Sequence, residues 1–171
     1  MQEIELKFLN VDVKSIREKI SNIGAILKYE TMIESTLFIA DGFDGWNSSK
    51  KFLRVRKVDD KVQITYKGPE EESRMTSREE IEINADSYED SIKLISKLGF
   101  TKEDTYRKQR IHYELGDISF ELDTLDNIPT YLEIETNTEK SMIEVCKSLE
   151  LDIKKGKKGT IVEILPERFN K

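Results

Sequence analysis

Charged residues of both signs alternate with apolar residues along several short segments of the chain. Near the N-terminus, Glu3, Glu5 and Lys7 occupy alternate positions with an apolar residue after each one. Residues i, i+2 and i+4 share one face of a β-strand, so each such segment predicts a strand with one charged face and one apolar face. The charged positions of these segments are Glu3, Glu5, Lys7, Arg54, Arg56, Lys67, Arg78, Glu80, Glu82, Lys108, Arg110, Glu121, Asp123, Glu133 and Glu135.

These residue types suit a metal ion and a phosphate chain. Carboxylates are preferred ligands of Mg²⁺ and Mn²⁺, while arginine forks and lysine ammonium groups bind phosphate oxygens. Two interpretations are open at this point. The charged faces could be the solvated side of an ordinary sheet, or they could line the inside of a barrel whose apolar outer face packs beneath helices. Buried charges on this scale would need water, ion pairs or metal ions.

The elements that position these residues are mainly strands. Alternation and β-branched or aromatic residues predict strands over residues 2–9, 25–39, 51–58, 61–67, 78–83, 106–115, 117–125 and 131–136. Apolar residues at helical spacing predict three helices, over residues 13–23, 87–98 and 138–149. With no long linker between these elements, a single domain over residues 1–171 is expected.

Composition excludes several classes of protein. The net charge of -6 argues against nucleic-acid binding. No run of about 18 apolar residues exists, so no membrane span is expected. The charged start and the single cysteine, Cys146, favour a reducing compartment, the cytoplasm. The lysine-rich run 154–160 lacks the P-loop pattern and predicts a solvated loop, in which a lysine could close one mouth of a tunnel.

The order of the charged motifs resembles one family. An opening E-x-E-x-K at residues 3–7 is followed by LRVR (53–56), ITYKG (64–68), SREEIE (77–82), LGF (98–100), RKQR (107–110), ELD (121–123) and YLEIE (131–135). This series is similar to that of the CYTH superfamily, the triphosphate tunnel metalloenzymes, and most of all to the branch of class IV adenylyl cyclases. The resemblance implies an α+β fold, with a closed eight-stranded antiparallel β-barrel and flanking helices. It also implies a homodimer.

The resemblance assigns roles to individual residues. It implies Mg²⁺ or Mn²⁺ as cofactor, with Glu3, Glu5, Asp123, Glu133 and Glu135 at the metal. The residues that bind the phosphates and take part in catalysis would be Lys7, Arg54, Lys67 and Arg110. Substrate binding would add Arg56, Arg78, Lys108, Glu80 and Glu82. His112 shares the alternating face of Lys108 and Arg110, as either a proton carrier or a structural residue.

The expected function is an enzyme acting on a triphosphate, either ATP or inorganic triphosphate. The matched branch favours cyclisation of ATP to cyclic AMP and pyrophosphate. Two departures from the branch favour a hydrolase of inorganic or thiamine triphosphate instead: residues 35–38 read STLF where a D-x-Y-F pattern is common, and residues 129–130 read PT where Leu-Gly is common. A non-catalytic polyphosphate or nucleotide binder and a plain interaction module are the alternatives from other classes.

Overall fold

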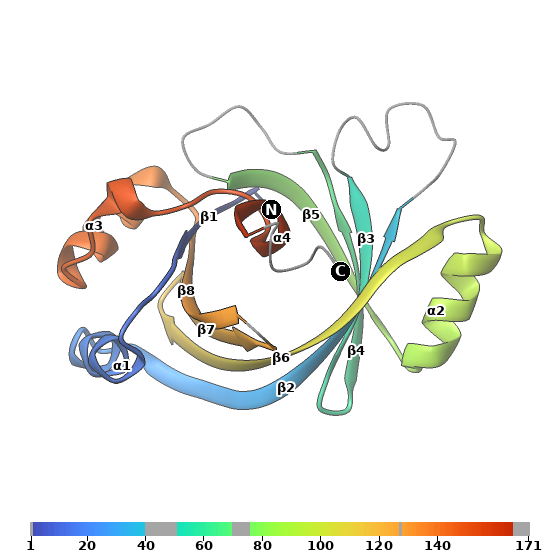
Figure 1. The fold of residues 1–171 in the computed structure, drawn as a ribbon, viewed down its shortest axis with the longest axis horizontal. Helices are drawn as coiled ribbons and strands as arrows, with labels where there is room; N and C mark the ends of the chain where they lie inside the picture. The colour runs from blue at the N-terminus through green and yellow to red at the C-terminus, as the bar shows by residue number, and fades with distance from the viewer. Residues whose placement is uncertain (1, 40–50, 70–75, 127, 166–171) are drawn as a thin grey trace. The chain divides into compact units, whose positions relative to one another are not determined.

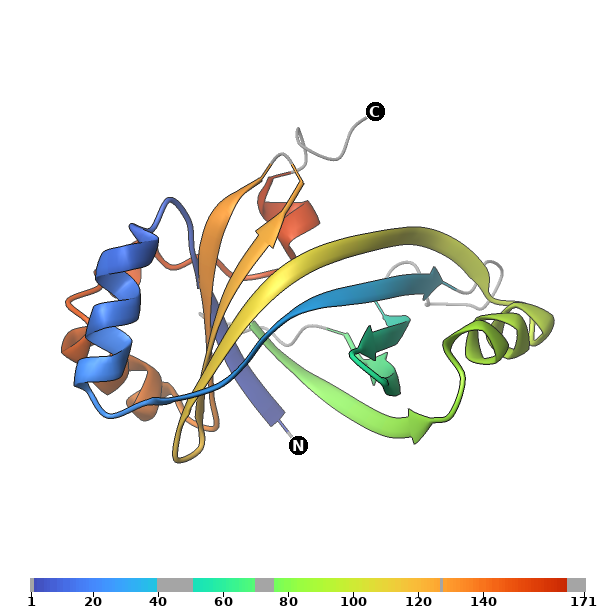
Figure 2. The ribbon, with the colours of Figure 1, turned by 90° about the horizontal axis from the view of Figure 1, so that it is seen from below.

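The computed structural model describes residues 2–39, 51–69, 76–126 and 128–165. Within these residues the strands are β1 (Gln2–Phe8), β2 (Ile26–Ile39), β3 (Phe52–Val58), β4 (Lys61–Lys67), β5 (Thr76–Ala85), β6 (Thr101–Leu115), β7 (Ile118–Leu125) and β8 (Ile128–Thr136). The helices are α1 (Val13–Asn22), α2 (Tyr88–Lys97), α3 (Glu139–Ser148), the short α4 (Ile161–Ile164) and a 3-10 turn, η1 (Ile153–Lys155). Figure 1 labels these elements, and Figure 2 draws them from a second side.

The chain falls into two compact units that share its two longest strands. The first unit contains β3, β4, α2, most of β5, the end of β2 and the start of β6. Its strands follow the order β5-β4-β3-β2-β6. The second unit contains β1, β7, β8, the remaining helices, the start of β2 and the end of β6, in the strand order β2-β6-β7-β8-β1.

In the first unit, α2 covers the apolar face of the strands. The cross-strand pairs Arg54–Thr65 and Thr65–Glu82 set one face of β3, β4 and β5, and residues at odd spacing from these lie on the other face. That other face forms a buried core with α2 that contains Phe38, Val55, Val62, Tyr88 and Ile95. Tyr88 of α2 also shares a hydrogen bond with Thr36 of β2 at 2.8 Å.

In the second unit, α1 and α3 cover the apolar face of the strands, and both views place them on the same side of it (Figures 1 and 2). The core is formed by Leu6, Phe8, Ile16, Ile20, Ala25, Ile111, Tyr113, Phe120, Leu122, Leu132, Ile134, Met142, Val145, Cys146 and Leu149. The strand residues of this core alternate with the charged positions. The charged side chains therefore lie on the face of the strands opposite to α1 and α3.

Local signals fix where the helices and hairpins begin. Asp12, Ser87 and Thr138 are the N-caps of α1, α2 and α3, and each side chain accepts a hydrogen bond from the third residue after it. The β3–β4 hairpin turns at Asp59, whose φ is 52°, and the β6–β7 hairpin turns at Gly116, whose φ is 57°. Both are left-handed conformations, which aspartate tolerates and glycine adopts without strain.

The largest differences from the sequence expectation are in three segments. β6 begins at Thr101, five residues early, because its polar start carries no apolar alternation. β8 begins at Ile128 and includes Pro129, a residue that normally argues against a strand. The lysines of the run 154–160 are exposed, as a solvated loop requires, but the run also contains the end of η1 and a β-bridge between Lys157 and Lys7, and α4 follows directly.

Eight strands with antiparallel pairing and three flanking helices are confirmed. Closure of the sheet into a barrel and the single-domain assignment stay predictions. Among the described residues, no helix has the length and apolar character needed to cross a membrane.

Candidate functional site

A set of buried and half-buried charged side chains lies on the strands of the second unit, on the face away from α1 and α3. We call this set the carboxylate face. It consists of Glu5 and Lys7 on β1, Arg110 and His112 on β6, Glu121 and Asp123 on β7, and Glu133 and Glu135 on β8. Lys7, Arg110 and Glu133 are at most 7% exposed, and Asp123 is fully buried. The interpretation of a solvated face is therefore wrong for this unit.

Lys7 lies between two carboxylates. Its Nζ is 2.8 Å from Glu5 Oε1 and 3.2 Å from Glu133 Oε1. Glu133 is the residue directly opposite Lys7 in the β1–β8 pair, which explains the contact. Burial disfavours the ammonium group, but the charges of Glu133 and Glu5 outweigh burial and raise the pKa of Lys7 above its ordinary value. Lys7 is a permanent cation at neutral pH.

Arg110 binds both acidic residues of β7. Its Nε and Nη2 donate to the two oxygens of Asp123 at 2.7 and 2.6 Å, and its Nη1 contacts Glu121. The hydroxyl of Tyr131 donates to Asp123 as well, at 3.3 Å. Desolvation opposes the charge of Glu121, yet Arg110 above all holds the pKa of that carboxyl below its ordinary value. The forked guanidinium fixes both carboxylates in one arrangement.

His112 continues this network along β6. Its Nδ1 lies 3.4 Å from Glu121 Oε1, and its ring stacks on Tyr29 with a centroid distance of 4.8 Å. Burial lowers the pKa of the imidazole, but the contacts with Glu121 and Glu114 outweigh it, so the net pKa is raised. The sequence assigned no role to Glu121 or Tyr29. Only the alternation of the ELD motif pointed to Glu121, and no signal pointed to the stack.

The carboxylate face fits a divalent cation. Ligand oxygens of Glu5, Glu133 and Glu135 lie within 4.8 Å of one another, and those of Glu121, Asp123 and Glu133 do the same. Within the described part of this face, five carboxylates lie with two permanent cations, so the face has an excess of negative charge. Among the described residues, Glu121 Oε2 is a buried oxygen without a hydrogen-bond partner. Such oxygen donors suit Mg²⁺ or Mn²⁺. Glu3 lies on β1, and its side chain is outside the described residues.

The first unit presents a second charged set, which we call the basic face. It consists of Arg54 and Arg56 on β3, Lys67 on β4, Glu80 and Glu82 on β5, and Lys108 on β6. The registers place Arg54 opposite Thr65 and Thr65 opposite Glu82. Lys108 lies three residues after Thr105, whose hydroxyl contacts Thr36 on the helix-covered face. Four cations face two carboxylates here, so the basic face suits an anion.

Within the basic face, some donor nitrogens have acceptors in the described part of the chain, and one buried nitrogen does not. Arg56 donates to Gln63 at 3.1 and 2.7 Å and contacts Glu82 at 3.4 Å. Lys67 forms an ion pair with Glu80. Arg54 Nε is buried and has no hydrogen-bond partner among the described residues. A buried guanidinium nitrogen without a partner is costly unless a ligand supplies one. Arg78 lies on β5, and its side chain is outside the described residues.

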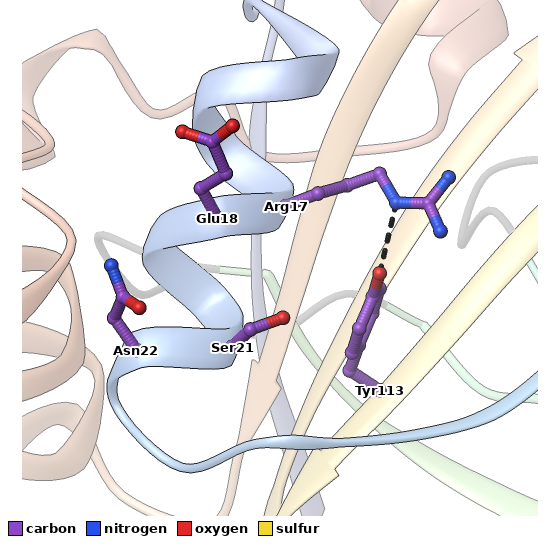
Figure 3. Close-up of a pocket in the computed structure, with 5 residues that line it drawn as sticks. All are labelled: Arg17, Glu18, Ser21, Asn22 and Tyr113. Atoms are coloured by element: carbon purple, nitrogen blue, oxygen red, sulfur yellow. Dashed lines mark hydrogen bonds between the residues drawn. The ribbon is translucent and has the colours of Figure 1, made fainter.

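A pocket of about 480 Å³ lies between α1 and β6 and is lined by Arg17, Glu18, Ser21, Asn22 and Tyr113. Figure 3 shows Arg17 of α1 directed toward Tyr113, to whose hydroxyl its Nε donates at 2.9 Å. Tyr113 belongs to the helix-covered core. The pocket is therefore on the face of β6 opposite to Arg110 and His112, and it is no part of the carboxylate face.

One unit carries a carboxylate face that fits a divalent cation, and the other carries a basic face that suits an anion. Comparison with known proteins identifies the family. The CYTH domain matches residues 1–159, so the chain belongs to the CYTH family. This confirms the resemblance read from the motifs.

Three relatives illustrate the match. A protein of Methanocaldococcus jannaschii, MJ0240, which has the provisional name of adenylate cyclase, is 27% identical over 161 residues, covering 88% of this chain and 91% of its own. The PH1012 protein of Pyrococcus horikoshii OT3 is similar in structure, with a TM-score of 0.80, 29% identity and coverage of 94% and 98%. A Hippeastrum protein, HpAC1, provisionally named adenylyl cyclase and described as having dominant triphosphatase activity, has a TM-score of 0.66, 16% identity and coverage of 97% and 95%; at this identity the likeness shows the fold alone.

Proposed function

We propose that this protein is a divalent-metal-dependent enzyme that acts on a triphosphate, and that its reaction is the adenylyl cyclase type. The observation that supports this most is the separation of charge: an excess of buried and half-buried carboxylates on one face and an excess of cations on the other. A pure anion binder would gain little from five clustered carboxylates, which repel both one another and the ligand. A metal ion that joins carboxylates to phosphate oxygens accounts for both signs.

Each set of residues has a proposed role toward one substrate. Glu5, Asp123, Glu133 and Glu135, with Glu3, would hold the metal, which when bound would neutralise phosphate charge. Arg54, Arg56, Lys67 and Lys108, with Arg78, would bind phosphate oxygens, and Glu80 and Glu82 would orient these cations. Lys7 and Arg110 would stabilise the charge that develops during transfer, because each is held in place by carboxylates. We also propose that the strands close into the barrel typical of the family.

Two reactions are compatible with this machinery. In cyclisation, the ribose 3′-oxygen forms a bond to the α-phosphorus and loses its proton, while the bond to pyrophosphate breaks. The adenylate cyclase name of the Methanocaldococcus relative supports this reaction. In hydrolysis, water forms a bond to the terminal phosphorus and loses a proton, while the bond from that phosphorus to the bridging oxygen breaks; pyrophosphate leaves from inorganic triphosphate, and the attacked phosphoryl group becomes orthophosphate. Hydrolysis, the second candidate, is favoured by residues 35–38. Ser35 and Leu37 stand where the cyclase branch commonly has an acidic and an aromatic residue, and they lie on the same face as Arg56 and Arg54.

Product identification tests the proposal. The purified protein would be incubated with ATP and, separately, with inorganic triphosphate, each with Mg²⁺ and with Mn²⁺, and the products separated by ion-exchange chromatography. We expect cyclic AMP and pyrophosphate from ATP. Orthophosphate from inorganic triphosphate without cyclic AMP would instead establish the hydrolase. No metal-dependent turnover of either compound would contradict the enzymatic proposal.

A further inference from the structure

The chain between η1 and α4 lies against one edge of β1. Lys7 N–H donates to the carbonyl of Lys157 at 2.9 Å, and Lys157 N–H donates to the carbonyl of Lys7 at 2.8 Å. Two residues that exchange both hydrogen bonds are directly opposite in an antiparallel pair, with Cα atoms about 5.5 Å apart and side chains on the same face. Lys157 therefore lies on the same face as Lys7, whose own ammonium group contacts Glu5 and Glu133.

Gly156 gives an independent indication of the same orientation. A Cβ atom at this position would lie 3.0 Å from Leu6 Cδ1 and 3.3 Å from Phe8 Cζ, both of which belong to the core beneath α1 and α3. The backbone of Gly156 is extended, so the next side chain points to the opposite side. Gly156 faces the core, and the side chain of Lys157 lies on the same side of β1 as the carboxylate face.

The segment is held on both sides of the bridge. Asp152 accepts a hydrogen bond from Lys154 N at 3.1 Å at the start of η1. After the bridge, Thr160 and Glu163 form a capping box at α4. Lys157 thus has a backbone that is fixed by local structure before it and after it, which is what a ligand-contacting residue requires.

Lys157 differs from Lys7 in what surrounds its charge. Lys7 is compensated by Glu5 and Glu133. The side chain of Lys157 is exposed, and it makes neither a hydrogen bond nor an ion pair with the described part of the chain. An uncompensated ammonium group beside a metal-binding face can pair with an anion that the metal also holds.

We propose that Lys157 is a further substrate-binding residue, which contacts an oxygen of the phosphate chain beside Lys7. This inference rests on the proposed function, and it adds the C-terminal segment to a site that the sequence motifs confine to residues 3–135. The lysine-rich run then contributes to the site through one of its lysines, while Lys154 and Lys155 lie in the exposed turn η1.

Calorimetric binding of inorganic triphosphate in the presence of Mg²⁺ tests the inference on the full chain. Lys157→Ala is compared with Lys155→Ala, which removes the same charge two residues away, and with Lys157→Arg. We expect Lys157→Ala to raise Kd about tenfold, as the loss of one charge-assisted contact does. Lys155→Ala should change Kd less than about twofold, and Lys157→Arg should keep most of the affinity because arginine retains the charge.

The outcomes separate this inference from the proposed function. Lys157→Ala keeps both backbone hydrogen bonds, so the fold should persist, and thermal melting checks it. If the wild-type protein binds triphosphate but Lys157→Ala binds as tightly as Lys155→Ala, the inference is wrong and the proposed function stands. A lower melting temperature with unchanged affinity overturns it equally, since the ammonium would then only compensate carboxylates. A wild-type protein that does not bind triphosphate overturns the proposed function itself.

Discussion

Arg110 is the residue on which two buried carboxylates depend. Asp123 is fully buried, Glu121 is nearly so, and both are bound by the same guanidinium group. Arg110→Ala would leave two buried anions without their cation. We expect the free energy of unfolding of the metal-free protein to fall by about 3–5 kcal/mol, measured by urea denaturation. The control is Arg107→Ala on the same strand, whose ion pair with Glu34 at 3.0 Å is exposed and should contribute about 0–1 kcal/mol.

The same variant also tests a role in catalysis. We expect Arg110→Ala, like Arg54→Ala, to lower kcat/KM by at least ~100-fold, equivalent to about 2.7 kcal/mol of transition-state stabilisation. Arg110→Lys should recover only part of this loss, because a single ammonium cannot bridge Glu121 and Asp123 as a fork does. Steady-state kinetics on triphosphate would check these values. Near-normal turnover by both alanine variants would remove the arginines from the mechanism.

Glu5 combines two opposing interactions. Its oxygen contacts Lys7 at 2.8 Å, but its partner directly across β1 and β8 is Glu135, and like charges in that position repel. Glu5→Gln should therefore leave the melting temperature of the metal-free protein nearly unchanged or slightly higher. Mg²⁺ affinity should fall at least about tenfold, because an amide is a poor ligand for this ion, with activity lost in parallel. Titration calorimetry with Mg²⁺ measures the affinity, and Glu144→Gln on the exposed side of α3 is the matched control.

At the scale of elements, α3 is attached to the sheet through Met142, Val145 and Cys146. Burial raises the pKa of the Cys146 thiol from its ordinary 9.0 to about 11. Between these values the unfolded chain loses this proton and the folded chain keeps it, so this thiol makes stability fall as pH rises from about 9 to about 11. We expect no alkylation of the native protein by iodoacetamide at pH 8, and rapid alkylation in urea. Fast modification of the folded protein would show that α3 detaches from the sheet.

At the scale of the whole molecule, the excess of carboxylates over cations on the carboxylate face predicts a fold that depends on ligands. Mg²⁺ should raise the melting temperature, and inorganic triphosphate with Mg²⁺ should raise it further, since ligands that bind only the folded state stabilise it by about 2.7 kcal/mol at 100 times Kd. Differential scanning fluorimetry measures both steps. NaCl at matched ionic strength is the control, because screening alone should give a much smaller shift. Equal shifts with NaCl and Mg²⁺ would show that no specific metal site exists.

Assembly is the other property at this scale. The family resemblance implies a homodimer, which stays a prediction. Light scattering in solution should then give twice the mass of one chain, with or without triphosphate. A mass of one chain at all concentrations would contradict it.

Local patterns in the sequence were enough to predict most elements. Period-2 alternation gave the eight strands, with β4 at its correct bounds, and helical apolar stripes gave α1, α2 and α3. The same alternation predicted which face of each strand is charged and which is apolar, because odd and even positions of a strand point to opposite faces. The start of β6 and Pro129 in β8 were missed, since pairing with neighbouring strands overrides weak local preference there.

The order of the charged motifs along the chain determined the family and the residue types of the site. Only the tertiary structure decided that the carboxylate face is buried, that Glu133 belongs to two carboxylate groups, and that His112 stacks on Tyr29. It alone brought Lys157 opposite Lys7, across 150 residues of chain. The physical reason is common to these cases. Alternation fixes which way a side chain points, but the neighbour it meets depends on the register between distant segments, which the packing of the core determines.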